Sequence, residues 1–280
     1  MKITGLLLGI FFLTLSTYAQ HITGMATYQT KTTINLDDWG GQGMSEQRKK
    51  QIMERMKNFL EKEYTLTFTQ EESFFKEEER LEAPGQGAMG RWGGSFAQGG
   101  IYTNQQTHEF ARANDLMGKT FLIQDSLSNL NWELVKESKI IGQYPVFKAV
   151  AQRPVEASPW EKLRAVRRQQ RSELPVEDST TTKMETIVAW YTPMIPVQHG
   201  PDEFGGLPGL ILELNTANTT MLCTKVVLNP KTEITIERPE KGKVVSRKEY
   251  QEIVEEKGRE MMERYGRGRG QNGGFNRRGQ

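Results

Sequence analysis

The residues best suited to chemistry lie in one short run, His199-Gly200-Pro201-Asp202-Glu203. An imidazole beside two carboxylates could act in acid–base catalysis or bind a metal. The other histidines, His21 and His108, do not lie at metal-ligand spacing from it, and no nucleophile-elbow or zinc-protease motif occurs. Carboxylates next to glycine and proline usually serve as cap and turn residues. We therefore expect a protein that is not an enzyme, with no metal site and no cofactor.

This run belongs to a loop whose backbone shape is encoded by proline and glycine. Proline fixes φ and glycine permits positive φ, so the path of the loop depends little on its packing. We predict that this loop organises the fold, between an aromatic β-rich run and two apolar strands. The structural positions of the loop are Pro193, Pro196, Gly200, Pro201, Gly205, Gly206, Pro208 and Gly209.

Aromatic and apolar side chains on and beside the loop are the candidate ligand-binding residues. They are Trp190, Tyr191, His199, Phe204, Leu207, Leu210, Leu212 and Glu213. A curved antiparallel sheet can leave a concave apolar face to hold a ligand. The alternative is that these side chains fill the core, as strand aromatics usually do. In a regular strand Ile211 and Glu213 point away from Leu210, Leu212 and Leu214, so that Glu213 faces solvent or the cavity.

Short stretches of β character recur along the chain and predict a mainly β fold with a few helices. The expected strands are 22–34, 64–69, 73–76, 101–104, 107–112, 119–124, 132–135, 145–150 and 232–238, besides the strands flanking the loop. Regular short strands favour an antiparallel meander over β-α units. We therefore expect a curved antiparallel sheet or half-barrel with peripheral amphipathic helices. Residues 84–100 contain seven glycines and are expected to form a surface loop.

Three helices are predicted from their N-terminal caps. Ser45 precedes a helix to about Lys62. The run Ser158-Pro159-Trp160-Glu161 starts a basic helix, which is either a solvated insertion or a contact helix for an acidic partner or membrane surface. Ser246-Arg247-Lys248-Glu249 is a second capping box.

The N-terminus has the pattern of a secretory signal peptide. Lys2 supplies a positive charge, Leu6 to Leu15 is apolar, and small residues precede a cleavage point after Ala19. The apolar run is too short to cross a bilayer, which needs about 20 residues. We expect no transmembrane segment in the mature chain. The predicted organisation is 1–19 signal peptide, 20–152 first part of one β-rich domain, 153–185 basic helical insertion, 186–238 C-terminal strands with the loop, 239–265 C-terminal helix and 266–280 disordered Gly/Arg tail.

Composition narrows the partners and the compartment. The single cysteine, Cys223, cannot form an intramolecular disulfide, so the core must hold the fold. The formal net charge is only +2, which gives no overall field for nucleic acid. The arginines of the tail resemble RNA-binding repeats, but an exported chain rarely meets RNA. We expect no nucleic-acid partner.

The run Phe204-Gly205-Gly206-Leu207-Pro208-Gly209-Leu210-Ile211 contains the hexapeptide Gly-Leu-Pro-Gly-Leu-Ile. The chain resembles the GLPGLI family of exported Bacteroidetes proteins. The motifs Ala189-Trp190-Tyr191-Thr192 and Ile141-Gly142-Gln143-Tyr144 support the resemblance, as do Ile195-Pro196, Gly200-Pro201 and Lys148-Ala149. Two departures are Val146, where the family often has a cysteine, and the long 153–185 insertion.

The resemblance implies no catalytic residues. It implies a location in the periplasm, possible association with the outer membrane, and a fold similar to lipoprotein carriers. The expected partners are an outer-membrane protein or a TonB-dependent receptor, or a lipid. The function we expect is a non-enzymatic binding or chaperone-like module for a lipid or an outer-membrane protein. The alternative is a structural accessory subunit of an outer-membrane receptor or assembly complex; metal handling by methionines and His199 is a more distant one.

Overall fold

The computed structural model describes residues 22–34, 36, 43–78, 96–155 and 184–268. Twelve strands and two helices lie within these ranges. The strands are β1 (Gly24–Thr32), β2 (Glu61–Phe68), β3 (Glu72–Glu77), β4 (Phe96–Asn104), β5 (Glu109–Leu116), β6 (Lys119–Ser126), β7 (Glu133–Ile141), β8 (Tyr144–Pro154), β9 (Met184–Thr192), β10 (Leu210–Asn215), β11 (Thr219–Leu228) and β12 (Lys243–Val245). The helices are α2 (Glu46–Leu60) and α5 (Arg247–Gly268).

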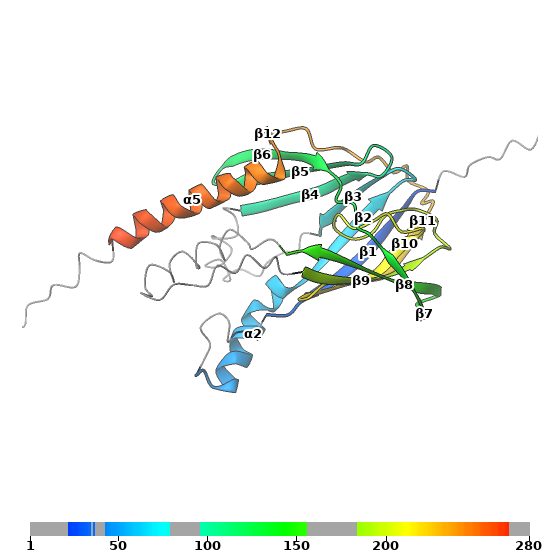
Figure 1. Ribbon diagram of the computed structural model, residues 1–280, viewed down its shortest axis with the longest axis horizontal. Helices are drawn as coiled ribbons and strands as arrows, with labels where there is room; N and C mark the ends of the chain where they lie inside the picture. The colour runs from blue at the N-terminus through cyan, green and yellow to red at the C-terminus, as the bar shows by residue number, and fades with distance from the viewer. Residues whose placement is uncertain (1–21, 35, 37–42, 79–95, 156–183, 269–280) are drawn as a thin grey trace, which may run out of the picture.

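All twelve strands belong to one open sheet (Figure 1). Their order is β12-β6-β5-β4-β3-β2-β1-β11-β10-β9-β8-β7. Every pairing is antiparallel except that of β12 with β6, which is parallel. The expectation of a mainly β, antiparallel fold with a few helices is confirmed. The sheet is neither closed nor strongly curled, and β12 and β7 remain separate edges, so it does not form the expected half-barrel. β1 and β11 pair at the centre and join a first half, β2 to β6, to a second half, β7 to β10.

The local sequence signals explain both described helices. Ser45 is the N-cap of α2, and its hydroxyl accepts a hydrogen bond of 3.4 Å from the Arg48 backbone. The predicted capping box of α5 is present, because the Ser246 hydroxyl accepts from the Glu249 backbone at 3.2 Å. The Glu249 carboxylate in turn accepts from the Ser246 backbone at 2.7 Å. Among the described helices, none is long and apolar enough to cross a membrane.

The end of the glycine-rich stretch 84–100 is a strand and not a loop. Residues 96–100 open β4, and the register with β5 shifts between Gln98 and Ile101. A Cβ on Gly99 would lie 2.1 Å from the carbonyl oxygen of Ala113, so glycine lets the two backbones approach closely at this bulge. The loop prediction was wrong here because glycine was read as a chain breaker. Residues 84–95 lie outside the described residues.

The last strand also differs from its prediction. Residues 232–238 form no strand, and the sheet ends instead with the short β12. Residues 232–238 pair with no strand in the described part of the chain. Arg238 anchors this segment through an ion pair with Glu109 on β5. The predicted helix at 158–171 and the tail 269–280 lie outside the described residues. The connection between β8 and β9 is shorter than the predicted insertion 153–185, because β8 continues to Pro154 and β9 begins at Met184.

Buried side chains form two clusters, and β10 contributes to both. The first cluster extends over most of the sheet and includes Leu210 and Leu212, with Tyr250 of α5 packed against it. The second lies around β8 and β9 and includes Ile211 and Leu214. A strand that is apolar on both sides belongs to the interior of a protein. The Gly/Pro loop 193–209, which we call the signature loop, precedes β10 and therefore enters the centre of the molecule.

Candidate functional site

The loop 193–209 is itself part of the core. The backbone amide of Leu210 donates to the carbonyl of Ile195, and that of Ile211 to the carbonyl of His199, each at 3.0 Å. Ile195 and Val197 are buried in the first cluster, whereas Phe204 and Leu207 are buried in the second. The loop thus joins the two clusters instead of lying over the surface.

Two glycines of the loop have steric reasons to be glycine. A Cβ on Gly209 would lie 2.2 Å from the carbonyl oxygen of Thr192, which is backbone and cannot move aside easily. Gly206 has a φ of +81°, in the left-handed region that favours glycine. The sequence-based view that the backbone of this loop is fixed by its residue types agrees with both observations.

His199 is buried within the loop region and is not available to a ligand. Its side chain packs near Phe68, with ring centroids 6.4 Å apart. Neither ring nitrogen makes a well-formed hydrogen bond among the described residues. Burial lowers the pKa of His199 to about 4, and the nearby backbone at Thr69 and Gln70 offsets part of that effect. The imidazole is therefore neutral at pH 7.

Most of the candidate ligand-binding side chains are core residues. Tyr191, Phe204, Leu207, Leu210 and Leu212 are all buried. Their distribution over two clusters means that they do not line one common cavity.

Trp190 and Glu213 lie together at the edge of the first cluster. Trp190 is half-buried, and the Lys139 ammonium lies 4.3 Å from the centroid of its ring. The same ammonium is 2.6 Å from Glu213 Oε2. The prediction that Glu213 points opposite to Leu212 assumed a regular strand. The strand is not regular, because the register of β10 with β9 shifts between Ile211 and Glu213. This bulge also places Leu214 in the second cluster with Ile211, away from Leu210.

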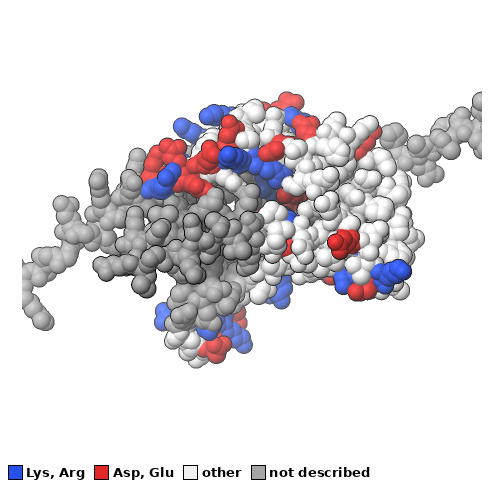
Figure 2. All heavy atoms as spheres, viewed as in Figure 1, with Lys and Arg blue, Asp and Glu red and all other residues white. Residues whose placement is uncertain are grey.

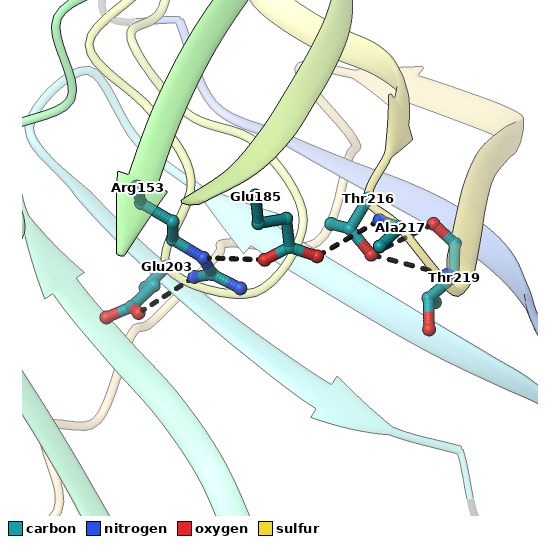
Figure 3. A network of polar contacts seen from close by, with 6 residues as sticks. All are labelled: Arg153, Glu185, Glu203, Thr216, Ala217 and Thr219. Atoms are coloured by element: carbon teal, nitrogen blue, oxygen red, sulfur yellow. Dashed lines mark hydrogen bonds and ion pairs between the residues drawn. The ribbon is translucent and has the colours of Figure 1, made fainter. Parts of the chain in front are cut away.

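A charged junction brings Glu203 of the loop together with two arginines from distant elements. Arg247 Nη2, at the start of α5, lies 2.5 Å from Glu203 Oε2, and Arg153 Nη1, near the end of β8, lies 4.0 Å from Glu203 Oε1. Arg153 Nε also donates to Glu185 at 3.1 Å. Figure 3 shows Arg153 between the two carboxylates. Glu185 continues the network by accepting a hydrogen bond of 3.0 Å from the Ala217 backbone amide.

Asp202 and Arg112 extend the junction into the interior. Burial raises the pKa of Asp202, Glu203 acts in the same direction, and the positive charges of Arg112, Arg153 and Arg247 oppose it. Asp202 has a φ of 59°, a conformation that aspartate tolerates better than most residues. The junction therefore contains acidic and basic groups that largely compensate one another.

A cavity of about 690 Å³ opens beside this junction. Its walls come from the β6–β7 connection, the facing ends of β8 and β9, the loop and the first turn of α5. Charged lining groups are Asp125, Arg153, Glu185, Glu203, Arg247 and Lys248. Figure 2 shows acidic and basic side chains next to each other on the described surface around α5. The volume lies within the range of small-ligand sites.

The α5 side of the cavity is held firmly. The backbone amide of Arg247 donates to Asp125 Oδ2 at 3.2 Å, and its guanidinium lies 3.7 Å from the centroid of the Phe110 ring. Tyr250 packs edge-to-face on Phe121 with centroids 5.8 Å apart. The start of α5 is thereby fixed to β5 and β6, and the cavity wall that it forms is preorganised.

The charged groups of the junction are held by contacts within the chain. Its carboxylates are engaged by arginines, and the loop histidine is buried elsewhere in the core. Within the described ranges no group of three or more His, Cys, Asp or Glu side chains could hold a metal ion. The arrangement offers fixed donors and acceptors of both signs to a polar ligand.

Sequence reasoning identified Glu203 and Phe204 but missed their partners. Arg153, Glu185 and Arg247 are far from the loop in sequence and carry no local motif that links them to it. The only signal was that Arg247 lies in a predicted helix start and Arg153 at a predicted segment boundary. Their convergence depends on the order of strands in the sheet.

The class of protein is thus a mainly β protein with one open sheet and a buried Gly/Pro loop. Residues 132–213 match the model of a family described as protein of unknown function (Porph_ging). This segment extends from the start of β7 to the middle of β10 and contains the Gly-Leu-Pro-Gly-Leu-Ile hexapeptide, so the chain carries the domain of the GLPGLI family there. The resemblance stated from the sequence is confirmed for this segment.

Two solved structures are similar to the chain at low identity. They are the structures of PNGF-II in the C2 and P21 space groups, each 15% identical, with TM-scores of 0.48 and 0.47. Each alignment covers 83% of this chain and 32% or 33% of the other chain, so this chain spans about a third of the length of PNGF-II. No curated protein matches the chain.

Proposed function

We propose that the protein is an exported, non-enzymatic component of the cell envelope that binds a segment of another protein at the charged cavity. The observation that carries the proposal is the lining of this cavity by ion-paired arginines and carboxylates from β8, β9, the signature loop and α5. A polypeptide segment presents backbone and side-chain groups of both hydrogen-bonding types. Such a segment complements a cavity with fixed donors and acceptors.

A lipid is the less suitable ligand for this site. A lipoprotein-carrier-like half-barrel would offer an acyl chain a continuous apolar lining, and Phe204, Leu207, Leu210 and Leu212 were the residues expected to supply it. Leu207, Leu210 and Leu212 are engaged in the core and do not line the cavity, and Phe204, which does line it, is 4% exposed. Beside Leu130, Val155 and Phe204, an acyl chain in the cavity would meet Arg153, Glu185 and other charged groups, whose desolvation it could not compensate. We therefore favour an outer-membrane protein or receptor as partner.

The experiment is affinity purification of the tagged protein from the envelope of its own cells, followed by protein and lipid mass spectrometry. A variant with two changed cavity residues, Asn129→Ala and Lys248→Glu, tests the site. Both side chains are exposed and line the cavity, so the fold should persist. Lys119→Glu is the matched control, because Lys119 is an exposed lysine at the start of β6 and does not line the cavity.

The proposal expects a stoichiometric envelope protein that is lost in the cavity variant and kept in the control. A stoichiometric lipid without a protein partner would overturn it in favour of a carrier. A protein partner that survives the cavity changes would indicate an accessory subunit that docks through another surface. Recovery of the protein in the cytoplasmic fraction would contradict the envelope assignment.

A further inference from the structure

β7 is an edge strand with exposed apolar side chains. It is the last strand in the sheet order, so its outer backbone edge faces no other strand among the described residues. Leu134 is 63% exposed and Ile140 is 75% exposed, although both are paired with residues of β8. Phe147 on β8 is 41% exposed. An unpaired edge with large apolar side chains is a surface on which another strand can pair.

The three apolar side chains lie on the same face of the hairpin. Leu134 is paired with Ala149, and Ser138 with Phe147. Ala149 and Phe147 are two residues apart on β8, so all four side chains lie on one face of the hairpin. Ile140 lies two residues beyond Ser138 and belongs to this face as well. The Phe147 ring packs 6.3 Å from Tyr191, which is part of the second buried cluster. The exposed patch is therefore a continuation of that cluster at the edge of the sheet.

Two ion pairs on the opposite face of the hairpin are formed within the chain. The Lys148 ammonium donates to both carboxylate oxygens of Glu137, each at 3.0 Å. Lys139 is paired with Glu213 at 2.6 Å. A strand that added to this edge would need no complementary charge for these groups. A neutral strand, or β7 of a second copy, suits the edge better than a strongly acidic or basic peptide.

We propose that β7 pairs antiparallel with β7 of a second copy of this chain, around a two-fold axis at Glu137. The sequence of the strand matches itself in this register. Leu134 stands opposite Ile140 of the second copy, and the two-fold axis repeats this apolar pair. Val135 stands opposite Lys139 of the second copy.

The irregularity within β7 fits this register. The pairing of β7 with β8 shifts between Val135 and Ser138, so residues 136 and 137 are displaced from the regular ladder. In the proposed dimer this displacement coincides with the two-fold axis. Residues 133–135 would pair with 139–141 of the second copy on either side of it. The like charges of the two Glu137 side chains at the axis are each compensated by Lys148 of the same chain.

Sedimentation velocity of the purified protein over a concentration series tests the dimer. Wild type should show a reversible monomer–dimer equilibrium, and Ile140→Asp should raise the dimer Kd at least about tenfold. Val244→Asp is the matched control, because Val244 is 59% exposed on β12 at the other edge of the sheet, and it should leave the Kd unchanged. Circular dichroism of each variant checks the fold.

A single introduced cysteine tests the register independently. Residues facing each other in an antiparallel pair have Cα separations that allow a disulfide. Glu137→Cys should form a disulfide-linked dimer under mild oxidation, whereas Lys119→Cys, at the exposed start of β6, should not. The natural Cys223 is buried and should stay unreacted. A wild-type protein that remains monomeric overturns the proposal. So does a dimer that survives Ile140→Asp, or one in which Glu137→Cys fails to cross-link.

Discussion

The hydroxyl of Tyr28 on β1 donates a hydrogen bond of 2.7 Å to the carbonyl oxygen of Ile211, where the bulge of β10 begins. β11 lies between these two strands, so the side chain reaches across one whole strand. Tyr28 is fully buried. Burial raises its pKa well above the usual value for tyrosine, with a smaller contribution from Cys223, so the phenol remains a donor at any physiological pH. The bond fixes the end of the signature loop to the centre of the sheet.

Tyr28→Phe should lower the free energy of unfolding by about 1–3 kcal/mol, because it leaves the Ile211 carbonyl without its buried donor. Urea denaturation measures the change. Tyr64→Phe is the matched control, since the Tyr64 hydroxyl makes only an exposed 3.5 Å contact with Glu77, and it should cost less than about 0.5 kcal/mol. Equal costs for the two variants would contradict the assigned role of the Tyr28–Ile211 bond.

Gly209→Ala should destabilise the protein more than Gly206→Ala. The new Cβ at position 209 would lie 2.2 Å from a backbone oxygen of Thr192, which forces the loop to move. At position 206 the space is open and the cost is only the left-handed conformation, about 1–2 kcal/mol. Thermal melts check the order of the two variants. A melting temperature that is lower for Gly206→Ala would show that the loop adapts easily at Thr192.

Leu207→Asp should prevent stable folding or cost about 4 kcal/mol or more, because Leu207 is almost fully buried in the second cluster. Met194→Asp is the control in the same loop. Met194 is 61% exposed, so that change should stay within about 0.5 kcal/mol. Urea denaturation of both variants gives the comparison, and a stable, cooperatively unfolding Leu207→Asp protein would show that the loop is not part of the core.

Stability should fall below pH 6.5 because of His199. Its pKa is about 4 in the folded chain and 6.5 as the ordinary value, so between these pH values the unfolded chain binds the extra proton. Stability from this group is complete above pH 6.5 and decreases as pH falls towards 4. The total loss is about 3 kcal/mol at 1.36 kcal/mol per pKa unit.

His199→Phe should flatten this part of the pH profile, whatever its effect on absolute stability. Phenylalanine keeps an aromatic ring beside Phe68 and removes the titrating group. Urea denaturation at several pH values between 4 and 7 measures the two slopes. Parallel profiles for wild type and variant would mean that His199 does not titrate in this range.

Glu203→Gln should cost about 1–3 kcal/mol, because it removes the carboxylate that lies between Arg153 and Arg247 and leaves their charges uncompensated. Glu46→Gln is the control: Glu46 is exposed on α2 and pairs with Lys49, so its loss should cost less than about 0.5 kcal/mol. Differential scanning calorimetry provides the measurement. If the two variants melt alike, the junction contributes little to stability.

Local features of the fold could be predicted because their causes are local. The caps at Ser45 and Ser246 need only a hydroxyl and, for Ser246, a glutamate three residues later. The alternation in β2 places Leu66 and Phe68 on the buried face without knowledge of the neighbouring strand. The failures at residues 96–100 and 232–238 have the opposite origin, since a strand exists only where another backbone lies beside it.

The antiparallel β class, the described helix starts, the Gly/Pro shape of the signature loop and its family hexapeptide could all be predicted from residue types and their spacing. Each of these follows from residue types within a few positions of one another. Tertiary structure alone decided that the loop is buried and that Glu203 meets Arg153 and Arg247. It also decided that a bulge after Ile211 moves Leu214 to the other cluster. Those contacts join strands that are distant along the chain, and no local spacing encodes which distant backbone will be the neighbour.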